Sequence, residues 1–177
     1  MKILSLHGYK GYMYNSAYQA LTEFGYEVIA PDIRYDEKSP RCILNELSQL
    51  YSEELCDAVV GTSLGGFFAA QLCVEKCCRA VFINPCLIPF VYLPKLGYNN
   101  QTGIREFSEL FSNITKLDKK LISTILGAED EIIDTHDYTK TMLENSRFFI
   151  VPGGMHSGAT LHLDEMFRNH SADFFGI

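Results

Sequence analysis

The chain has 177 residues, of which 47 % are apolar, so it can bury a sizeable core and does not have the composition of a disordered protein. Its net charge of −7, without a long basic run, argues against nucleic acids and anionic membranes as partners. No apolar run is long enough for a membrane span, and the strand pattern directly after Lys2 is not that of a signal peptide. We therefore expect a cytoplasmic protein with a single domain over residues 1–177.

The cysteines do not indicate a disulfide-rich or metal-binding protein. The chain has six of them, and without an export signal we expect reduced thiols. Cys73 and Cys77 lie one helical turn apart and could share a metal ion, but no histidine lies near them in the sequence, so we expect no metal site. The role of Cys86, which follows a predicted strand, stays open.

Short apolar runs alternate with amphipathic stretches along the chain, which predicts alternating strands and helices. In chain order we predict strand 3–6, helix 17–24, strand 26–30, a helix from Pro40, strand 57–60, helix 64–76, strand 79–84, helix 105–113, strand 121–126, a helix after Asp134, strand 148–151 and helix 163–174. This order gives parallel βαβ units with right-handed crossovers. The strands are almost continuously apolar, which fits a sheet covered on both faces. We expect a doubly wound α/β domain with a six-stranded, mainly parallel sheet and helices on both faces.

Capping residues mark several of the predicted helix starts. Asn15 or Ser16 can cap the first helix, Ser39 precedes a proline at the first position of the second, and Asp134 can cap a later one. Residues 85–104 interrupt the alternation, because their prolines, glycines and asparagines disfavour regular structure. We expect an irregular excursion that leaves a strand end on the active face of the sheet.

The pentapeptide Gly61-Thr62-Ser63-Leu64-Gly65 joins a predicted strand to a predicted helix. A Gly-x-Ser-x-Gly turn in this context is typical of a nucleophile elbow, which strains the serine backbone and exposes its hydroxyl. The two glycines are expected because a Cβ atom there would collide where strand and helix cross. The predicted helix begins directly behind Ser63, so its unpaired N–H groups would stabilise negative charge that develops beside the serine. The alternative is a plain glycine turn in which Ser63 only caps the helix.

Two later strand ends carry the residues that a serine nucleophile requires. Strand 121–126 leads to Asp130, and strand 148–151 leads to His156, so the chain order is serine, acid, histidine. We expect His156 to take the proton of Ser63, and Asp130 to hold the imidazole in the required tautomer. The alternative for His156 is an ordinary histidine of a surface loop.

Other acids and histidines lie close to these positions in the sequence. We interpret Glu129 and Glu131 as solvated surface acids, and Asp134 as a helix cap with His136 in the first turn that follows it. We interpret His7 as a buried structural histidine.

An oxyanion hole needs two backbone N–H donors. One is expected from Leu64, directly after the nucleophile, and the other from the loop after the first strand, at or near Tyr9. Gly8 allows this loop to approach closely.

Taken together, these motifs resemble those of α/β-hydrolases, and more narrowly those of the compact YqiA-type bacterial esterases. The resemblance covers nearly the whole chain and is carried by His7-Gly8, Gly61-Thr62-Ser63-Leu64-Gly65-Gly66, Asn84-Pro85, Pro89-Phe90, Thr102-Gly103, Glu129-Asp130-Glu131 and Gly153-Gly154-Met155-His156. It implies a serine esterase on the α/β-hydrolase fold with a minimal lid, and it also places the triad acid at Asp130. The cysteines and Leu87-Ile88 depart from the family pattern, so acyl preference does not carry over.

The expected function is hydrolysis of small-molecule carboxylic esters through an acyl-enzyme on Ser63, without a metal or organic cofactor. Residues 85–104 and the loop after the first strand are expected to form the pocket wall, unless the excursion is solvated and only covers the sheet. The expected lining side chains are Tyr12, Met13, Phe90, Val91 and Tyr92. An acyl thioesterase with the same triad and a non-catalytic binding protein on this fold are the alternatives.

Overall fold

The computed structural model of the protein describes residues 1–176. The strands are β1 (Lys2–Leu6), β2 (Glu27–Ile29), β3 (Ala58–Thr62), β4 (Arg79–Ile83), β5 (Ile122–Gly127) and β6 (Arg147–Val151). The α-helices are α1 (Ser16–Glu23), α2 (Pro40–Glu53), α3 (Leu64–Lys76), α4 (Pro89–Tyr92), α5 (Gln101–Phe111), α6 (Asp137–Met142) and α7 (Leu163–Phe175). The 3₁₀ helices are η1 (Leu93–Leu96), η2 (Ser112–Lys116), η3 (Lys119–Leu121) and η4 (Gly158–Thr160). Within this range no helix is both long and apolar enough to cross a membrane.

The strands form one sheet in the order β2-β1-β3-β4-β5-β6, and every neighbouring pair is parallel. The chain moves outward from β1 to β2 and then returns to the other side of β1 with β3, so the winding direction changes between β1 and β3. In open parallel sheets, ligand sites lie beyond the carboxyl ends of the strands at such a switch point. The two loops that meet here begin at His7 and at Ser63.

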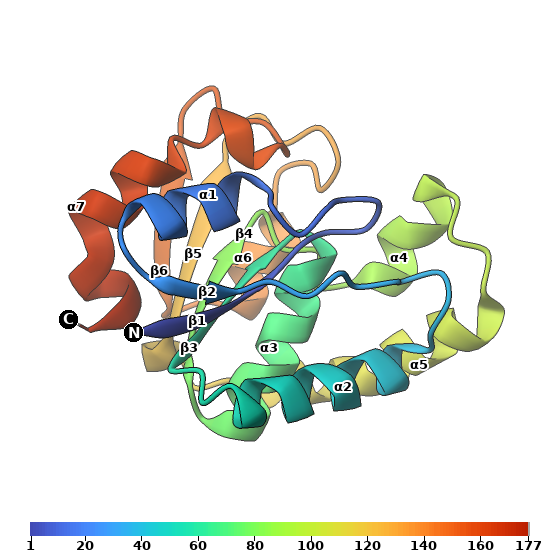
Figure 1. The fold of residues 1–177 in the computed structure, drawn as a ribbon. Coiled ribbons are helices and arrows are strands. Elements are labelled where there is room, and N and C mark those ends of the chain that lie inside the picture. The colour runs from blue at the N-terminus through green and yellow to red at the C-terminus, as the bar shows by residue number, and fades with distance from the viewer. Residues whose placement is uncertain (177) are drawn as a thin grey trace.

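Helices cover both faces of the sheet, as the sequence predicts (Figure 1). On one face α1 packs against α7, and α7 contacts β4 and β5; on the other face α3 lies against β1, β3 and β4 and also contacts α2. Successive side chains of a strand point to opposite faces. In β4, Phe82 therefore joins the core that contains residues of α2, α3 and α5, while Val81 and Ile83 join the core that contains residues of α1 and α7.

The starts of α1 and α2 are capped as the sequence predicts. The side-chain oxygen of Asn15 accepts the N–H groups of Ala17 and Tyr18 at 3.0 and 3.1 Å. The Ser39 hydroxyl accepts the N–H of Cys42, and a proline occupies the first turn of α2. These bonds satisfy N–H groups that have no partner inside the helix.

The start of α6 differs from the prediction. The helix begins at Asp137 with His136 as its N-cap residue, so Asp134 is not the cap. Asp134 and His136 have φ angles of 61° and 56°. Because an α-helix requires negative φ angles, the chain turns twice before the helix can begin.

Residues 85–104 contain more helix than the sequence predicts. They include α4, η1 and the first residues of α5. Pro89 and Pro94 lie in the first turns of α4 and η1, where the missing proline N–H has no helical partner to lose. Gly97 ends η1 with a φ angle of 93°. The residues that suggested irregular structure therefore begin and end short helices.

Candidate active site

Ser63 lies at the turn between β3 and α3, where the sequence places a nucleophile elbow. Its φ and ψ angles are 53° and −118°, which non-glycine residues rarely adopt. The turn is held on both sides, because Ser63 N–H donates to Ile83 O and Ser63 O accepts from Cys86 N, both at 2.9 Å. The helix α3 begins at the next residue, Leu64. A strained serine between a buried strand and a helix N-terminus is the geometry of a nucleophile elbow.

Close backbone approaches explain the two glycines that flank this turn. A Cβ atom on Gly65 would lie 2.7 Å from the carbonyl oxygen of His7. A Cβ atom on Gly61 would lie 2.7 Å from the backbone nitrogen of Gly66. Main-chain atoms cannot rotate away from such a contact, so the predicted collision between strand and helix is confirmed.

The carboxylate of Asp130 is fully buried beside His156. Asp130 Oδ2 lies 2.8 Å from His156 Nδ1, and Asp130 Oδ1 accepts the N–H groups of Ile132 and Ile133, both at 2.8 Å. Burial by itself raises the pKa of Asp130, but hydrogen bonds from His136, His156 and Ile133 N–H outweigh it and hold this pKa well below its usual range. Asp130 is therefore ionised, and His156 donates its Nδ1 hydrogen to it. In the neutral ring this leaves a lone pair on Nε2.

The lowered pKa of Asp130 predicts a contribution to stability that is lost in acid. A carboxyl group of this kind stabilises the fold above its unfolded pKa, about 3.9 for aspartate, and the contribution disappears as the pH falls towards the folded pKa. We expect Asp130→Asn to lower the free energy of unfolding at neutral pH, and we expect its difference from wild type to narrow below about pH 4. Urea unfolding on both sides of that pH measures the effect. Asp134→Asn, at an exposed position of the same loop, is the control for removing a carboxylate that the fold does not bury. A difference in the free energy of unfolding between wild type and Asp130→Asn that stays constant with pH would contradict the expectation.

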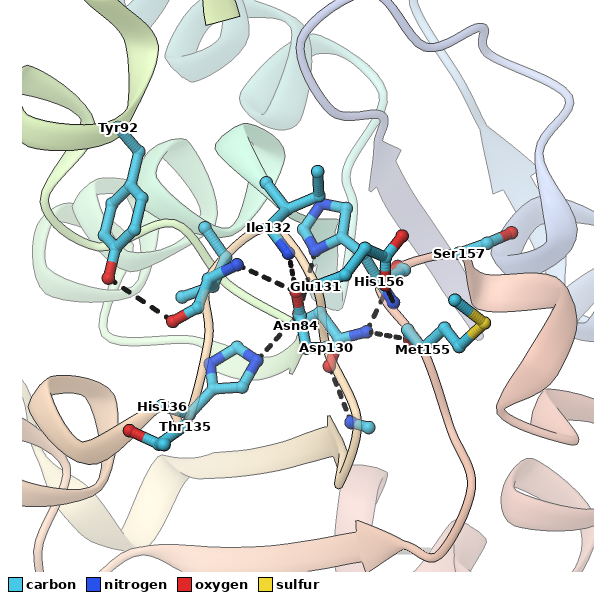
Figure 2. A network of polar contacts seen from close by, with 12 residues as sticks. Asn84, Tyr92, Asp130, Glu131, Ile132, Thr135, His136, Met155, His156 and Ser157 are labelled. Carbon is cyan, nitrogen blue, oxygen red and sulfur yellow. Dashed lines mark hydrogen bonds and ion pairs between the residues drawn. The ribbon is translucent and has the colours of Figure 1, made fainter. Parts of the chain in front are cut away.

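Two further side chains hold the loop that carries His156 (Figure 2). The Glu131 carboxylate accepts the His156 backbone N–H at 2.9 Å, so Glu131 is not simply the solvated acid that the sequence suggests. Asn84, fully buried after β4, donates from Nδ2 to the carbonyl oxygens of Met155 and His156 at 2.8 and 3.1 Å. Its Oδ1 accepts the N–H of Gly127 at 2.7 Å. Asn84 thus ties the ends of β4 and β5 to the histidine loop.

A second histidine contacts the same carboxylate, and the sequence does not indicate this contact. His136 Nε2 lies 2.8 Å from Asp130 Oδ2, and the His136 side chain is only 1 % exposed. His136 precedes α6 and does not lie in its first turn, which corrects the prediction. Only the short spacing from Asp130 could have pointed to the contact, and that spacing fits many loop conformations.

Ser63 and His156 line a common cavity of about 260 Å³. Its wall is mostly apolar and is completed by Tyr9, Lys10, Leu64, Cys86, Leu93, Leu96, Ile132 and Ile133. Lys10 Nζ donates to Leu96 O at 2.9 Å, which joins the loop after β1 to η1. Two hollows of similar size lie along α2 and between α1 and η4, and neither contains Ser63, Asp130 or His156.

The cavity is lined by the predicted segments but not by the predicted side chains. Tyr12 is 64 % exposed and borders a smaller hollow, and Met13 is half-buried away from the cavity wall. Phe90 packs against Phe111, Val91 is exposed, and the Tyr92 hydroxyl donates to Ile133 O at 3.3 Å. The physical reason is that η1 follows α4 directly, so that Leu93 and Leu96 reach the cavity in place of the α4 residues.

The two residues predicted to supply oxyanion donors, Tyr9 and Leu64, both line the cavity beside Ser63. His7 is buried and is not part of its wall. His7 Nε2 accepts the Ile33 N–H at 3.0 Å, so the ring hydrogen is on Nδ1, which lies 2.8 Å from Gly8 O. These bonds fasten the loop after β1 and confirm the structural role predicted for His7.

The remaining side chains that could do chemistry are possible metal ligands and thiols. Among residues 1–176, no three histidine, cysteine, aspartate or glutamate side chains are grouped as metal ligands. All six cysteines are free thiols. Cys86 lies in the cavity wall, and its burial, together with the charge of Asp130, raises the pKa of its thiol to about 12. Cys86 is therefore protonated at neutral pH and is a poor nucleophile.

A parallel sheet wound in this order, with an elbow after β3 and a histidine loop after β6, defines the α/β-hydrolase fold. Within this class, the chain belongs to UPF0227, described as an uncharacterised protein family, whose family model matches residues 2–162. This membership fits the resemblance to small esterases. No curated protein matches the sequence.

Solved structures share the fold at low sequence identity. Est1E from Butyrivibrio proteoclasticus is 15 % identical with a TM-score of 0.70, over 97 % of this chain and 88 % of that one. The esterase RhEst1 from Rhodococcus sp. ECU1013 is 14 % identical with a TM-score of 0.65, over 97 % and 90 % of the two chains. The meta-cleavage product hydrolase CumD from Pseudomonas fluorescens IP01 is 17 % identical with a TM-score of 0.66, over 99 % and 90 %. At these identities the likeness shows the fold alone.

Proposed function

We propose that the protein is a serine hydrolase that cleaves carboxylic esters through an acyl-enzyme on Ser63. The observation that carries this proposal is that Ser63, on a strained elbow, shares one cavity with His156, whose Nδ1 is bound to the buried Asp130 carboxylate. The esterase named among the structural relatives, RhEst1, supports the choice of ester chemistry. The mostly apolar wall of the cavity fits an uncharged ester better than a charged substrate.

In the first half of the reaction, the Ser63 oxygen attacks the acyl carbonyl carbon while His156 Nε2 takes the serine proton. The carbonyl electron pair moves to oxygen, and the N–H groups of Tyr9 and Leu64 stabilise the oxyanion. The bond to the leaving alcohol then breaks as His156 returns the proton to it. Asp130 stabilises the imidazolium during this step and keeps the lone pair on Nε2 before it.

In the second half, water takes the place of the alcohol. His156 removes a proton from the water, which attacks the acyl carbon, and the serine oxygen leaves with that proton. The acid product is released and Ser63 is restored. Each half therefore uses His156 first as a base and then as an acid.

A fluorophosphonate probe tests the proposal directly, because it reacts with activated serines. We expect one covalent adduct, and peptide mapping should locate it on Ser63. A folded protein that forms no adduct would contradict the proposal and favour the non-catalytic binding protein. Comparing turnover of matched oxygen and sulfur esters then distinguishes an esterase from a thioesterase.

The rate of hydrolysis should depend on pH through a single titration. His156 must be neutral to take the serine proton, so kcat should rise from acid to neutral pH as the ring loses its proton. The measurement is kcat on one uncharged ester across this range, with pre-steady-state kinetics to show that acyl transfer limits the rate. A flat profile under those conditions would exclude His156 as the base.

A further inference from the structure

Two histidines share one oxygen of the Asp130 carboxylate (Figure 2). His156 Nδ1 and His136 Nε2 both lie 2.8 Å from Asp130 Oδ2. A serine hydrolase mechanism requires only the first of these contacts. The second comes from a side chain that does not line the cavity and is almost completely buried.

The surroundings of His136 set its protonation state. Because Oδ2 belongs to a carboxylate, the His136 nitrogen beside it must carry hydrogen. The other nitrogen, Nδ1, is buried and has no hydrogen-bond partner within residues 1–176. The Asp130 carboxylate would compensate a positive charge on the ring, but a hydrogen on Nδ1 would be a buried donor without a partner, which is costlier than a buried lone pair. His136 is therefore a neutral donor.

A neutral donor suits the role of Asp130. The carboxylate must keep its negative charge to stabilise the His156 imidazolium, and a lysine or arginine at the position of His136 would cancel that charge. Oδ1 is already held by two backbone N–H groups, those of Ile132 and Ile133. Without His136, His156 would be the one partner of Oδ2 left within residues 1–176, and His156 is the ring that Oδ2 has to orient.

We propose that His136 is a positioning residue, which fixes Asp130 Oδ2 towards His156 while leaving the carboxylate charge intact. This inference rests on the function proposed above. The fold supports it, because His136 stands at a left-handed turn between Asp130 and α6, where His136 O accepts the Lys140 N–H at 2.8 Å. The Tyr92 hydroxyl also donates to Ile133 O, which fastens the same loop to α4.

Two amide substitutions separate positioning from packing. In His136→Gln the side-chain nitrogen is as many atoms from Cα as Nε2 is in histidine, so it can still donate to Asp130 Oδ2. In His136→Asn the amide is one carbon too short to reach Oδ2. Asparagine also tolerates a positive φ angle better than most residues, so the shorter variant is not handicapped by backbone strain.

The experiment measures kcat and KM on one ester for wild type, His136→Asn and His136→Gln. In each sample the maximal rate is divided by the concentration of sites that a fluorophosphonate titrates, which gives kcat per site. We expect His136→Asn to lower kcat per site roughly 10-fold with little change in KM, and His136→Gln to recover most of the loss. Thermal unfolding of the same samples shows whether stability follows activity. A purely structural role predicts that the two variants lose activity together, in proportion to their loss of folded protein.

The possible outcomes distinguish a failure of the role proposed for His136 from a failure of the proposed hydrolase function. A wild type that neither labels nor turns over ester would overturn both. A wild type that labels on Ser63, with His136→Asn equal to it in kcat per site, would overturn the role of His136 and leave the proposed function standing. The same holds if His136→Gln loses as much kcat per site as His136→Asn.

Discussion

Ser63→Ala is expected to abolish labelling by a fluorophosphonate and to lower kcat for ester hydrolysis by roughly 10³-fold or more. The loss is this large because a nucleophile and its base act as a unit, so that His156 has no proton to take once the hydroxyl is gone. Any remaining hydrolysis would come from the oxyanion donors and from substrate binding. The free energy of unfolding should change little, since the bonds of residue 63 to Ile83 and Cys86 are made by its backbone.

Ser157→Ala is the matched control for this variant. Ser157 follows His156 directly and is exposed, so it is the serine that the probe would reach if labelling needed only proximity to the histidine. We expect the Ser157 variant to label and to turn over ester close to the wild-type rate. A covalent adduct on folded Ser63→Ala would show that another residue is the nucleophile, and the assignment of the elbow would then be wrong.

The second large effect is expected from Asp130→Asn, which should lower kcat by roughly 10²- to 10⁴-fold with little change in KM. To keep accepting the N–H groups of Ile132 and Ile133, the new amide must place its oxygen at the Oδ1 position. Its NH₂ group then faces His156 Nδ1, which must give up its hydrogen. The hydrogen moves to Nε2, and His156 in that tautomer cannot accept the proton of Ser63.

Asp134→Asn is the control for this prediction. Asp134 is exposed and has a φ angle of 61°, a conformation that asparagine accommodates well. Although Asp134 does not cap α6, its replacement by asparagine should still leave kcat nearly unchanged. Both variants are measured on one ester under the same conditions. A larger loss of kcat in Asp134→Asn than in Asp130→Asn would move the triad acid to Asp134.

Several elements of the protein could be predicted from the sequence because the signals that determine them are local. The spacing of apolar residues in a segment reflects which face of that helix or strand is buried. This spacing predicts the strands and most helices to within a few residues. The elbow depends on five consecutive residues around Ser63, whose glycines are required by the crossing of strand and helix. The order of Ser63, Asp130 and His156 follows from the order of the strands, because parallel strands bring their carboxyl ends to one edge.

Other elements depend on contacts between segments that are far apart in the sequence. The short helices within residues 85–104 determine which side chains reach the cavity, so Leu93 and Leu96 line it where Phe90 and Tyr92 were predicted. Asn84 holds the histidine loop across more than seventy residues of chain, a pairing that no local pattern encodes.

The sequence by itself therefore determined the layered fold and the elbow, and it predicted the triad of Ser63, Asp130 and His156. Only the tertiary structure decided that Asp130 is shared with His136. That contact requires left-handed backbone at Asp134 and His136, which turns the chain back onto the carboxylate before α6 begins. Neither residue is a glycine, and sequence patterns predict helical or extended backbone for such residues, so the turn becomes evident only when the loop is seen packed against the sheet.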